Sequence, residues 1–351
     1  MMKHMIFGES HGPAIGVVLE GVKSGLVIDM GFISGEMDRR KPGQNDLSTP
    51  RKEADSVRIL SGVFEGRATG TPLCGIIENS DTRSGDYEAM KVLARPGHAD
   101  YSGYVRYNGF NDHRGSGHFS GRITAPLVFA GAVAKLMLKE SGVTVRARIR
   151  EIAGIEDIPS RLTDEDPSIL LGVAGKGFPV IDDARGELMK EAIRKAKDEH
   201  DSVGGIIECV VDGLPAGKGT PGRDSVESVL SLNMFAVPAV KGIEFGTGFD
   251  MARMKGSIAN DPFQYRDGRV MTTTNNNGGI NGGITNGMPV VFSVVIKPTS
   301  SIGLPQKTMN MRTLEDSEIA IEGRHDPCIV HRAVPVIEAA AALAICEVLG
   351  L

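Results

Sequence analysis

Histidines set in glycine-rich segments are the residues of this sequence best suited to chemistry. FGESHG (7–12) places Ser10 and His11 between glycines, so we expect a tight loop that presents both side chains. Histidine titrates near neutral pH, which suits it to proton transfer. Taken alone, this short motif fits equally well a His11 that only closes a turn. A second histidine, His98, stands between a Pro-Gly turn and Asp100 in RPGHADY.

Arginines and glycine-rich loops together indicate sites for small anions. Arg39 and Arg40 precede a Pro-Gly turn in MDRRKPGQ (37–44), and arginine matches phosphate and carboxylate geometry. A run of charges alone is more often a solvated surface. NDHRGSGHFSGRIT (111–124) is the stronger candidate, because it contains Arg122 and opens into an apolar run. The N–H groups and dipole at a helix N-terminus attract anions.

Polar loops near the C-terminus complete the candidate segments, which are NNNGGINGG (275–283), KPTSS (297–301) and GRHDP (323–327). Lysine and hydroxyl donors suit a phosphate group or the polar edge of a flavin ring. A solvated turn explains KPTSS equally well when it is taken alone. The sequence has no HExxH, GxSxG or correctly spaced Walker motif, so neither a metal nor a nucleophilic site is indicated.

The composition narrows the class of protein. The formal net charge of the 351 residues is -5, which argues against nucleic-acid binding because phosphate contacts need a basic surplus. The 4 cysteines lie far apart, so we expect reduced and mostly buried thiols rather than a zinc site or disulfide framework. We find neither a signal-peptide pattern nor an uninterrupted apolar run of membrane length, and we expect a cytoplasmic protein.

The elements that must position these loops follow from apolar patterning. Four β-branched runs predict strands at 14–20, 73–77, 205–211 and 289–296, and three segments predict helices at 124–140, 186–199 and 333–350. The first and last helices are apolar almost all round, so they must be covered on most sides, most simply by sheets. We therefore predict an α+β fold, with helices sandwiched between largely antiparallel sheets in a single domain over 1–351.

Ten motifs in sequence order resemble the chorismate synthase family. They are GESHG, DRRKPG, ILSGVFEGRATGTPL, IENSDTRSGDY, RPGHADY, PAVKGIEFGTGFD, NNGGINGG, KPTSS, GRHDPC and RAVPVIEA, and they run through nearly the whole chain. The resemblance implies a βαβ sandwich assembled as a homotetramer. It also implies a 1,4-elimination of phosphate from 5-enolpyruvylshikimate 3-phosphate, with reduced FMN that is required but not consumed and NADPH as a possible reductant.

The resemblance assigns roles to individual residues. His11 is similar to the acid that protonates the departing phosphate, and His98 to the histidine that protonates reduced flavin. Asp326, with Ser10 and Ser120, resembles a relay that tunes flavin nitrogen 5. The substrate would be held by Arg39, Arg40, Arg122 and Arg324. FMN would be lined by His118, Ser120, Ala239, Gly282, Lys297, Pro298, Thr299, Ser300, Ser301 and Arg324.

The chain also departs from the usual family pattern. The departures are His118-Phe119 for Arg-Ser, Ile123 for Glu, Asn276-Asn277 for His-Ala, Asp46 for a basic residue, and a shorter N-terminus. They indicate a reshaped site near the flavin and the substrate phosphate. Two other functions stay open at this point. A flavin oxidoreductase would consume NADPH without releasing phosphate, and a non-catalytic metabolite binder would not need His11 or His98.

Overall fold

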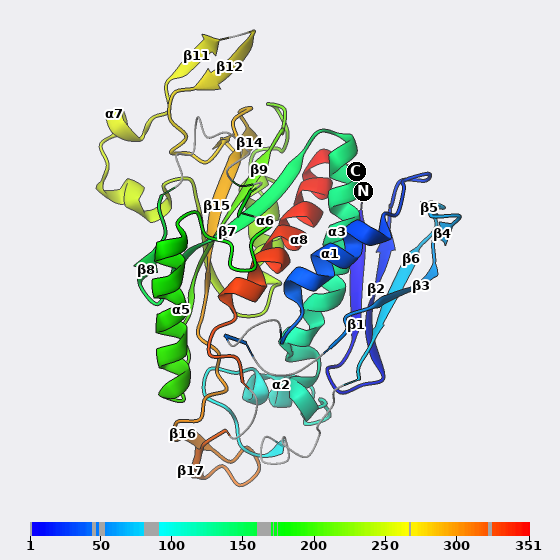
Figure 1. Cartoon of the computed structure of the whole chain (residues 1–351), viewed down its shortest axis with the longest axis vertical. Helices are drawn as coiled ribbons and strands as arrows, with labels where there is room; N and C mark the ends of the chain where they lie inside the picture. The colour runs from blue at the N-terminus through cyan, green and yellow to red at the C-terminus, as the bar shows by residue number, and fades with distance from the viewer. Residues whose placement is uncertain are drawn as a thin grey trace.

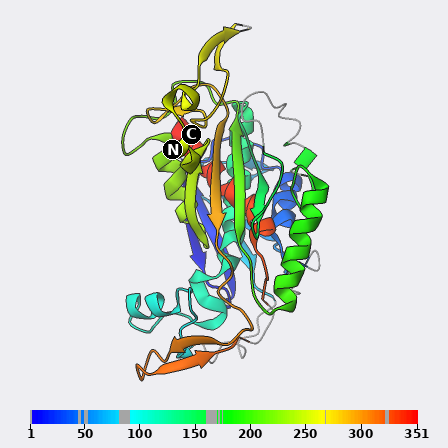
Figure 2. The same ribbon diagram turned by 90° about the vertical axis from the view of Figure 1, so that its left-hand side faces the viewer.

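Two antiparallel sheets enclose a layer of helices in this protein (Figures 1 and 2). The computed structural model describes residues 2–43, 47–48, 53–80, 91–159, 170, 172–173, 175–266, 268–321 and 325–351. One large hydrophobic core contains residues from near both ends of the chain, from Met2 to Cys346. The predicted α+β sandwich of helices between antiparallel sheets is confirmed.

The first sheet has the strand order β1-β2-β6-β3, with every neighbouring pair antiparallel. Its strands are β1 (Lys3–Gly8), β2 (Ala14–Glu20), β3 (Val57–Ser61) and β6 (Leu73–Glu78). Ile15, Val17 and Leu19 alternate along β2 and are fully buried, because successive side chains of a strand point to opposite faces. β1 and β2 are joined by the loop that carries GESHG.

The second sheet has the order β10-β15-β9-β7-β8 and is also antiparallel throughout. Its strands are β7 (Thr144–Ile152), β8 (Ile155–Glu156), β9 (Gly205–Asp212), β10 (Val240–Phe245) and β15 (Val290–Ile296). All four strands predicted from the sequence are present, within about one residue of their expected limits.

The helices of the middle layer are α1 (Met30–Arg40), α3 (Thr124–Glu140), α6 (Val226–Phe235) and α8 (Val330–Leu349), shown in Figure 1. The predicted apolar helices correspond to α3 and α8. Gly131 permits their close packing, because a Cβ atom there would lie 2.2 Å from Cβ of Ala339. By length and composition, Gly121–Glu140 could cross a membrane, but 83% of its most apolar stretch is buried inside the protein, as expected of a core helix.

The third predicted helix is α5 (Asp183–Asp198), which packs at the β8 edge of the second sheet. It begins earlier than expected because Asp182 caps it, accepting a hydrogen bond from the Ala184 nitrogen at 2.8 Å. The cysteines are Cys74, Cys209, Cys328 and Cys346; all are free thiols and the last three are buried, as the sequence predicted.

Shorter helices and strands lie at the two ends of the sandwich (Figure 1). At one end lie α2 (Asp100–Arg106), η3 (Arg114–Phe119), η4 (Gly121–Ile123), β16 (Gln306–Met309) and β17 (Asp316–Ile319). At the other end lie η5 (Gly248–Arg253), α7 (Gly256–Ala259), β11 (Phe263–Arg266), β12 (Arg269–Thr272), β13 (Ile280–Asn281) and β14 (Ile284–Thr285). A short pair, β4 (Val63–Phe64) and β5 (Arg67–Ala68), follows β3.

Candidate functional site

Most of the predicted site segments meet at the α2 end of the molecule (Figure 1). The β1–β2 loop bearing His11 is fixed there by hydrogen bonds to its backbone. The Ser10 nitrogen donates to the carbonyl of Gly117 at 3.2 Å, and the Asn79 side-chain amide donates to the carbonyls of Glu9 at 3.0 Å and Gly12 at 2.8 Å. These bonds hold the loop that presents His11 without using its imidazole.

Close packing of η3 against the His11 loop requires glycine at position 115. Gly115 has φ 56°, and a Cβ atom there would lie 2.4 Å from Cδ2 of His11 and 2.9 Å from the Ser10 hydroxyl. Both Ser10 and His11 are buried by this contact. The Ser10 hydroxyl has no hydrogen-bond partner within the described part of the chain, so it is available to a ligand.

The second histidine, His98, is oriented by Asp100. Its Nδ1 lies 2.7 Å from Oδ1 of Asp100 and 3.0 Å from Nη2 of Arg95. The carboxylate can only accept, and Nη2 of Arg95 already donates to Asp100 at 2.7 Å and to Ser116 at 2.9 Å, so we assign the proton to Nδ1, which donates a hydrogen bond to Asp100. This tautomer leaves Nε2 of His98 as the nitrogen that can exchange a proton with a ligand.

The surroundings of this pair move both pKa values. Burial lowers the pKa of His98 below its ordinary value, and the hydrogen bond that His98 donates to Asp100 only partly opposes the shift. Burial acts to raise the pKa of Asp100, but hydrogen bonds from Arg95 and His98 prevail and hold it well below the ordinary value. Asp100 is therefore ionised, while a large share of His98 is neutral near pH 7.

Arg95 connects the surroundings of the two histidines. Besides its 2.7 Å bond from Nε to Asp100, it donates to the hydroxyls of Ser116 at 2.9 Å and Ser301 at 3.1 Å. Ser116 directly follows the glycine that packs against His11. The η3 segment therefore lies between His11 on one side and the Arg95–Asp100–His98 group on the other.

Two buried arginines form the cationic part of the site. Arg40, from the end of α1, donates to Oδ2 of Asp55 at 3.1 Å, and Arg122, from η4, donates to Oδ1 of the same carboxylate. Burial lowers the pKa of Arg40 to about 10; Asp55 opposes this shift, while Arg332 and Arg122 add to it. Both guanidinium groups are therefore held in a crowded cationic region in which an anion would be stabilised.

Arg39 lies apart from this cluster, although it is the neighbour of Arg40 in sequence. Its two terminal nitrogens bind the buried carboxylate of Glu338 on α8 at 2.6 and 2.8 Å, and Lys135 binds the same carboxylate at 2.5 Å. Successive residues of a helix point about 100° apart. The structure thus places Arg39 in an ion-pair cluster between helices rather than beside Arg122.

Asp326, which precedes α8, is held close to the arginines. Nη1 of Arg332 donates to Asp326 at 2.7 Å, and Nε of Arg332 donates to the carbonyl of Arg40 at 3.2 Å. The hydroxyl of Thr299 donates to the Asp326 carbonyl at 2.9 Å. Arg324 and Asp46 lie outside the residues that the structure describes.

The KPTSS segment follows β15 and holds the loop that carries His98 through hydrogen bonds. Nζ of Lys297 donates to the Ser300 hydroxyl at 3.0 Å and to the carbonyl of Gly97, and Ser300 also donates to that carbonyl at 3.0 Å. Ala239, at φ 72°, accepts a hydrogen bond from the Lys297 nitrogen at 3.0 Å. Pro298 packs near Gly204 at the end of the second sheet.

The remaining predicted residues are split between the two ends. His118 donates from Nδ1 to the carbonyl of Gly8 at 2.9 Å, and Ser120 caps η4 by accepting from the Arg122 nitrogen at 3.2 Å. Gly282 lies in the β13–β14 turn, near the first residue of β15, whereas KPTSS follows the last residue. Because β15 has 7 residues, it separates these positions by about 20 Å. Within one chain, Gly282 therefore lies far from the other candidate residues.

Asn276 and Asn277 depart from the usual family pattern, and both lie at the same end of the molecule as Gly282. Their backbone nitrogens donate to Asp261 at 2.7 and 2.9 Å, and the Asn277 amide adds a bond of 2.7 Å. Burial acts to raise the pKa of Asp261, but these hydrogen bonds lower it overall. The pair therefore stabilises the turn before β13.

Four important residues had no assigned role in the sequence analysis: Asp55, Asn79, Arg95 and Arg332. Asn79, Arg95 and Arg332 lie within the motifs that resemble the chorismate synthase family, and this position in a motif could have identified them as site residues. Asp55 lies in no motif, and only its position between two arginines identifies it. Asp55, Asn79 and Arg95 each bind a polar side chain from a distant part of the chain, and Arg332 binds the distant backbone carbonyl of Arg40.

Two imidazoles and two buried arginines are gathered at one end of the sandwich, an arrangement suited to an enzyme that binds a small anion and transfers protons. A family model described as chorismate synthase matches residues 2–349. Chorismate synthase of Thermococcus kodakarensis is 44% identical over 347 residues, covering 99% of this chain and 95% of the relative. The Methanosarcina acetivorans protein of the same name is 46% identical over 347 residues, covering 99% and 94%.

Structural comparison agrees with these sequence matches. A crystal structure of chorismate synthase superposes with a TM-score of 0.76 at 28% identity, covering 99% of this chain and 91% of that one. The chain belongs to the chorismate synthase family. Its activity is the carbon–oxygen lyase reaction of the shikimate pathway, the elimination of phosphate from 5-enolpyruvylshikimate 3-phosphate to give chorismate. Enzymes of this family are in general flavin-dependent.

Proposed function

We propose that the elimination takes place between the His11 loop and the Arg95–Asp100–His98 group, with reduced FMN as a cofactor that is not consumed. The observation that carries this proposal is the position of η3. Gly115 contacts His11 while Ser116 accepts a hydrogen bond from Arg95, so two histidines far apart in sequence flank one short segment.

His11 is proposed as the acid that protonates the departing phosphate. A phosphate leaves more readily when its developing charge is neutralised by a proton and by nearby cations. Arg40 and Arg122, both buried, would hold the anionic groups of the substrate, and Arg324 would join them. Arg39 is left out of the proposed site because it lies in the Glu338 cluster between helices and not beside Arg122.

His98 is proposed as the histidine that protonates the reduced cofactor through Nε2, since its Nδ1 is committed to Asp100. Asp326, with the hydroxyls of Ser10 and Ser120, would relay the proton that leaves carbon 6. The buried and unpartnered Ser10 hydroxyl fits a ligand that offers polar ring atoms. When bound, reduced flavin would supply the electron density that weakens the allylic carbon–oxygen bond.

The cofactor would lie against polar groups of several loops. The residues proposed to hold FMN are His118, Ser120, Ala239, Lys297, Pro298, Thr299, Ser300, Ser301 and Arg324. The hydroxyls and Lys297 suit the polar edge of the ring or the phosphate. Gly282 is omitted because it lies at the opposite end of β15.

We also propose that the chain is a single cytoplasmic domain that assembles as a homotetramer and accepts NADPH-derived electrons for its flavin. The shared hydrophobic core supports the single domain. The β11–β12 hairpin protrudes from the molecule in Figures 1 and 2 and exposes Phe263, Tyr265 and Val270, which supports contact with another copy.

The proposed function is tested by anaerobic incubation of the full chain with chemically reduced FMN and 5-enolpyruvylshikimate 3-phosphate. Phosphate and chorismate are expected in equal amounts, with no net oxidation of the flavin. Flavin-linked NADPH consumption without phosphate release would instead identify an oxidoreductase. Omission of reduced FMN, with all other components present, is the control and should abolish product formation.

A further inference from the structure

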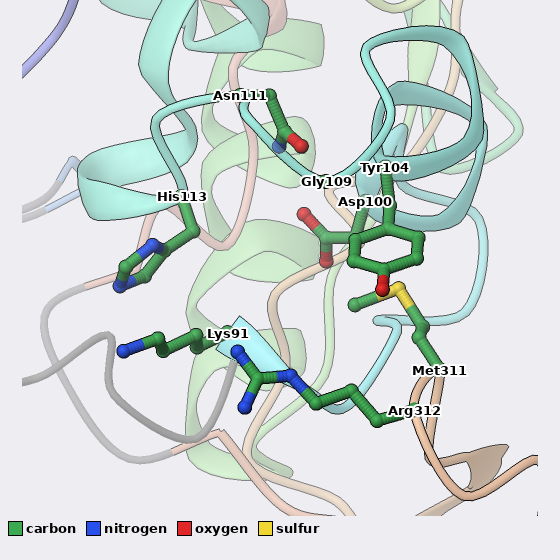
Figure 3. Close-up of a pocket in the computed structure, with 8 residues that line it drawn as sticks. All are labelled: Lys91, Asp100, Tyr104, Gly109, Asn111, His113, Met311 and Arg312. Atoms are coloured by element: carbon green, nitrogen blue, oxygen red, sulfur yellow. The ribbon is translucent and has the colours of Figure 1, made fainter.

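A small cavity, of about 70 Å³, lies beside Asp100, and none of its lining residues is among those proposed to bind substrate or flavin. It lies between α2, the segment that follows it, and the residues after β16 (Figure 3). Its lining residues are Lys91, Asp100, Tyr104, Gly109, Asn111, His113, Met311 and Arg312. Most of the polar groups in this lining are hydrogen-bond donors.

The cationic side chains of the cavity have no partners of their own. Lys91 and Arg312 are exposed, and their side chains form no hydrogen bond or ion pair with the residues covered by the structure. Nε2 of His113 is buried, and it too lacks a hydrogen-bond partner there. Figure 3 shows the ends of these three side chains on the same side of the cavity. A buried polar nitrogen without a partner is costly, so a ligand or water must satisfy it.

The one carboxylate in the lining does not neutralise these cations. Asp100 accepts hydrogen bonds from Nε of Arg95 at 2.7 Å and from Nδ1 of His98 at 2.7 Å. Its charge is therefore already balanced by Arg95 from outside the cavity. The positive charges of Lys91 and Arg312 are therefore not neutralised by Asp100. The Asn111 amide and the Tyr104 hydroxyl are further hydrogen-bond donors in the lining.

We propose that this cavity binds inorganic phosphate. Its volume of about 70 Å³ is several times the ~10–15 Å³ that one water molecule needs on the same measure, so a small tetrahedral oxyanion can enter. Lysine, arginine and imidazole donors are the groups that recognise such an anion.

Because of the position of the cavity, a bound phosphate would affect catalysis. Asp100 lines the cavity and also orients His98, so the anion would lie next to the residue that fixes the catalytic imidazole. This step rests on the proposed function, in which phosphate is a product. Phosphate should then inhibit turnover partly without competing with the substrate, because it occupies a place that the substrate does not.

Binding is tested without substrate or flavin, so its result does not depend on catalysis. Isothermal titration calorimetry of the full chain with inorganic phosphate compares wild type with the Lys91→Gln/Arg312→Gln double variant. Loss of charge-assisted hydrogen bonds should weaken the cavity site by at least about 10-fold. The matched control is Lys307→Gln/Arg269→Gln, which removes the same charge from exposed positions outside the cavity and should bind like wild type.

A second variant separates the cavity from the Arg40–Arg122 cluster, which can also attract phosphate. Asn111→Asp keeps the side-chain shape but places a negative charge in the cavity, so it should remove this site and the non-competitive part of phosphate inhibition. The KM for substrate should stay near the wild-type value. Unchanged phosphate affinity and inhibition in both cavity variants would overturn the proposal, whether or not chorismate is formed.

Discussion

Nε of Arg122 donates a hydrogen bond to the side-chain oxygen of Asn79 at 3.0 Å, while the amide nitrogen of Asn79 donates to the two carbonyls of the His11 loop. One side chain therefore fixes a buried anion-binding arginine relative to the loop that carries the proposed acid. This relationship depends on the amide, because its oxygen accepts from Arg122 while its NH2 group supplies the two hydrogens that the carbonyls accept.

Replacement of Asn79 by Asp should uncouple these two parts. The carboxylate can still accept from Arg122, but it repels the carbonyls of Glu9 and Gly12 that the amide now binds. We expect kcat/KM to fall about 10- to 100-fold, which corresponds to the loss of one or two such bonds. Flavin affinity, measured by fluorescence titration, should change little. A variant with wild-type kcat/KM would show that Asn79 does not position the loop.

Removal of either proposed acid should slow turnover. His11→Ala and His98→Ala are each expected to lower kcat by a factor of about 10²–10⁴, the range for general acid–base groups. His200→Ala, an exposed histidine outside the proposed site, is the control and should retain normal kcat. Chorismate formation in the presence of reduced FMN is the measurement. Near-normal turnover by either variant would refute the role of that histidine.

Asp100→Asn should shift the titration of His98 downward. Burial already lowers the pKa of His98, and the hydrogen bond to Asp100 opposes that shift. Removing the carboxylate leaves burial unopposed, so the pKa should fall further. Because His98 is proposed to act in its protonated form, kcat/KM should decline at lower pH than in wild type. The pKa is followed by the histidine C2 proton in NMR; an unchanged value would contradict this account.

Arg39→Gln should affect stability more than substrate binding. Its guanidinium binds the buried carboxylate of Glu338, which keeps Lys135 as a partner, so the loss should cost about 1.5–3 kcal/mol of unfolding free energy, the range for hydrogen bonds to a charged group. The matched variant Arg40→Gln should instead raise KM, because Arg40 belongs to the proposed anion site. Urea unfolding and steady-state kinetics separate the two effects. A larger KM change in Arg39→Gln than in Arg40→Gln would restore Arg39 to the substrate site.

The same cluster predicts how stability depends on pH. Burial acts to raise the pKa of Glu338, but Lys135 and Arg39 lower it to about 2, from a model-peptide value of 4.5. A lowered folded-state pKa contributes stability that is present above the unfolded pKa and is lost as pH falls toward the folded one. Unfolding free energy should therefore decline between about pH 4.5 and 2, and this part of the decline should be absent in Glu338→Gln.

Local sequence patterns predicted the elements of the fold well. The runs at 124–140 and 333–350 are apolar on every side, so they had to be interior helices, and α3 and α8 are confirmed as such. The elements missed include α1, α6, β1, β3, β7 and β10; in α1 and β7, glycines and charges interrupt the apolar period. Their side chains gain partners only in the folded protein: Arg148 on β7, for example, is buried between Asp157 and Glu208.

The sequence by itself determined the strands β2, β6, β9 and β15, the helices α3 and α8, and the motifs that bear histidine and arginine, since these depend on residue types a few positions apart. Only the tertiary structure decided that Arg40, and not Arg39, lies beside Arg122. It also decided that Asp55 and Asn79 connect the parts of the site. The reason is that a polar side chain takes its role from its partner. Most partners here come from distant segments, which meet only when both sheets have closed over the helices.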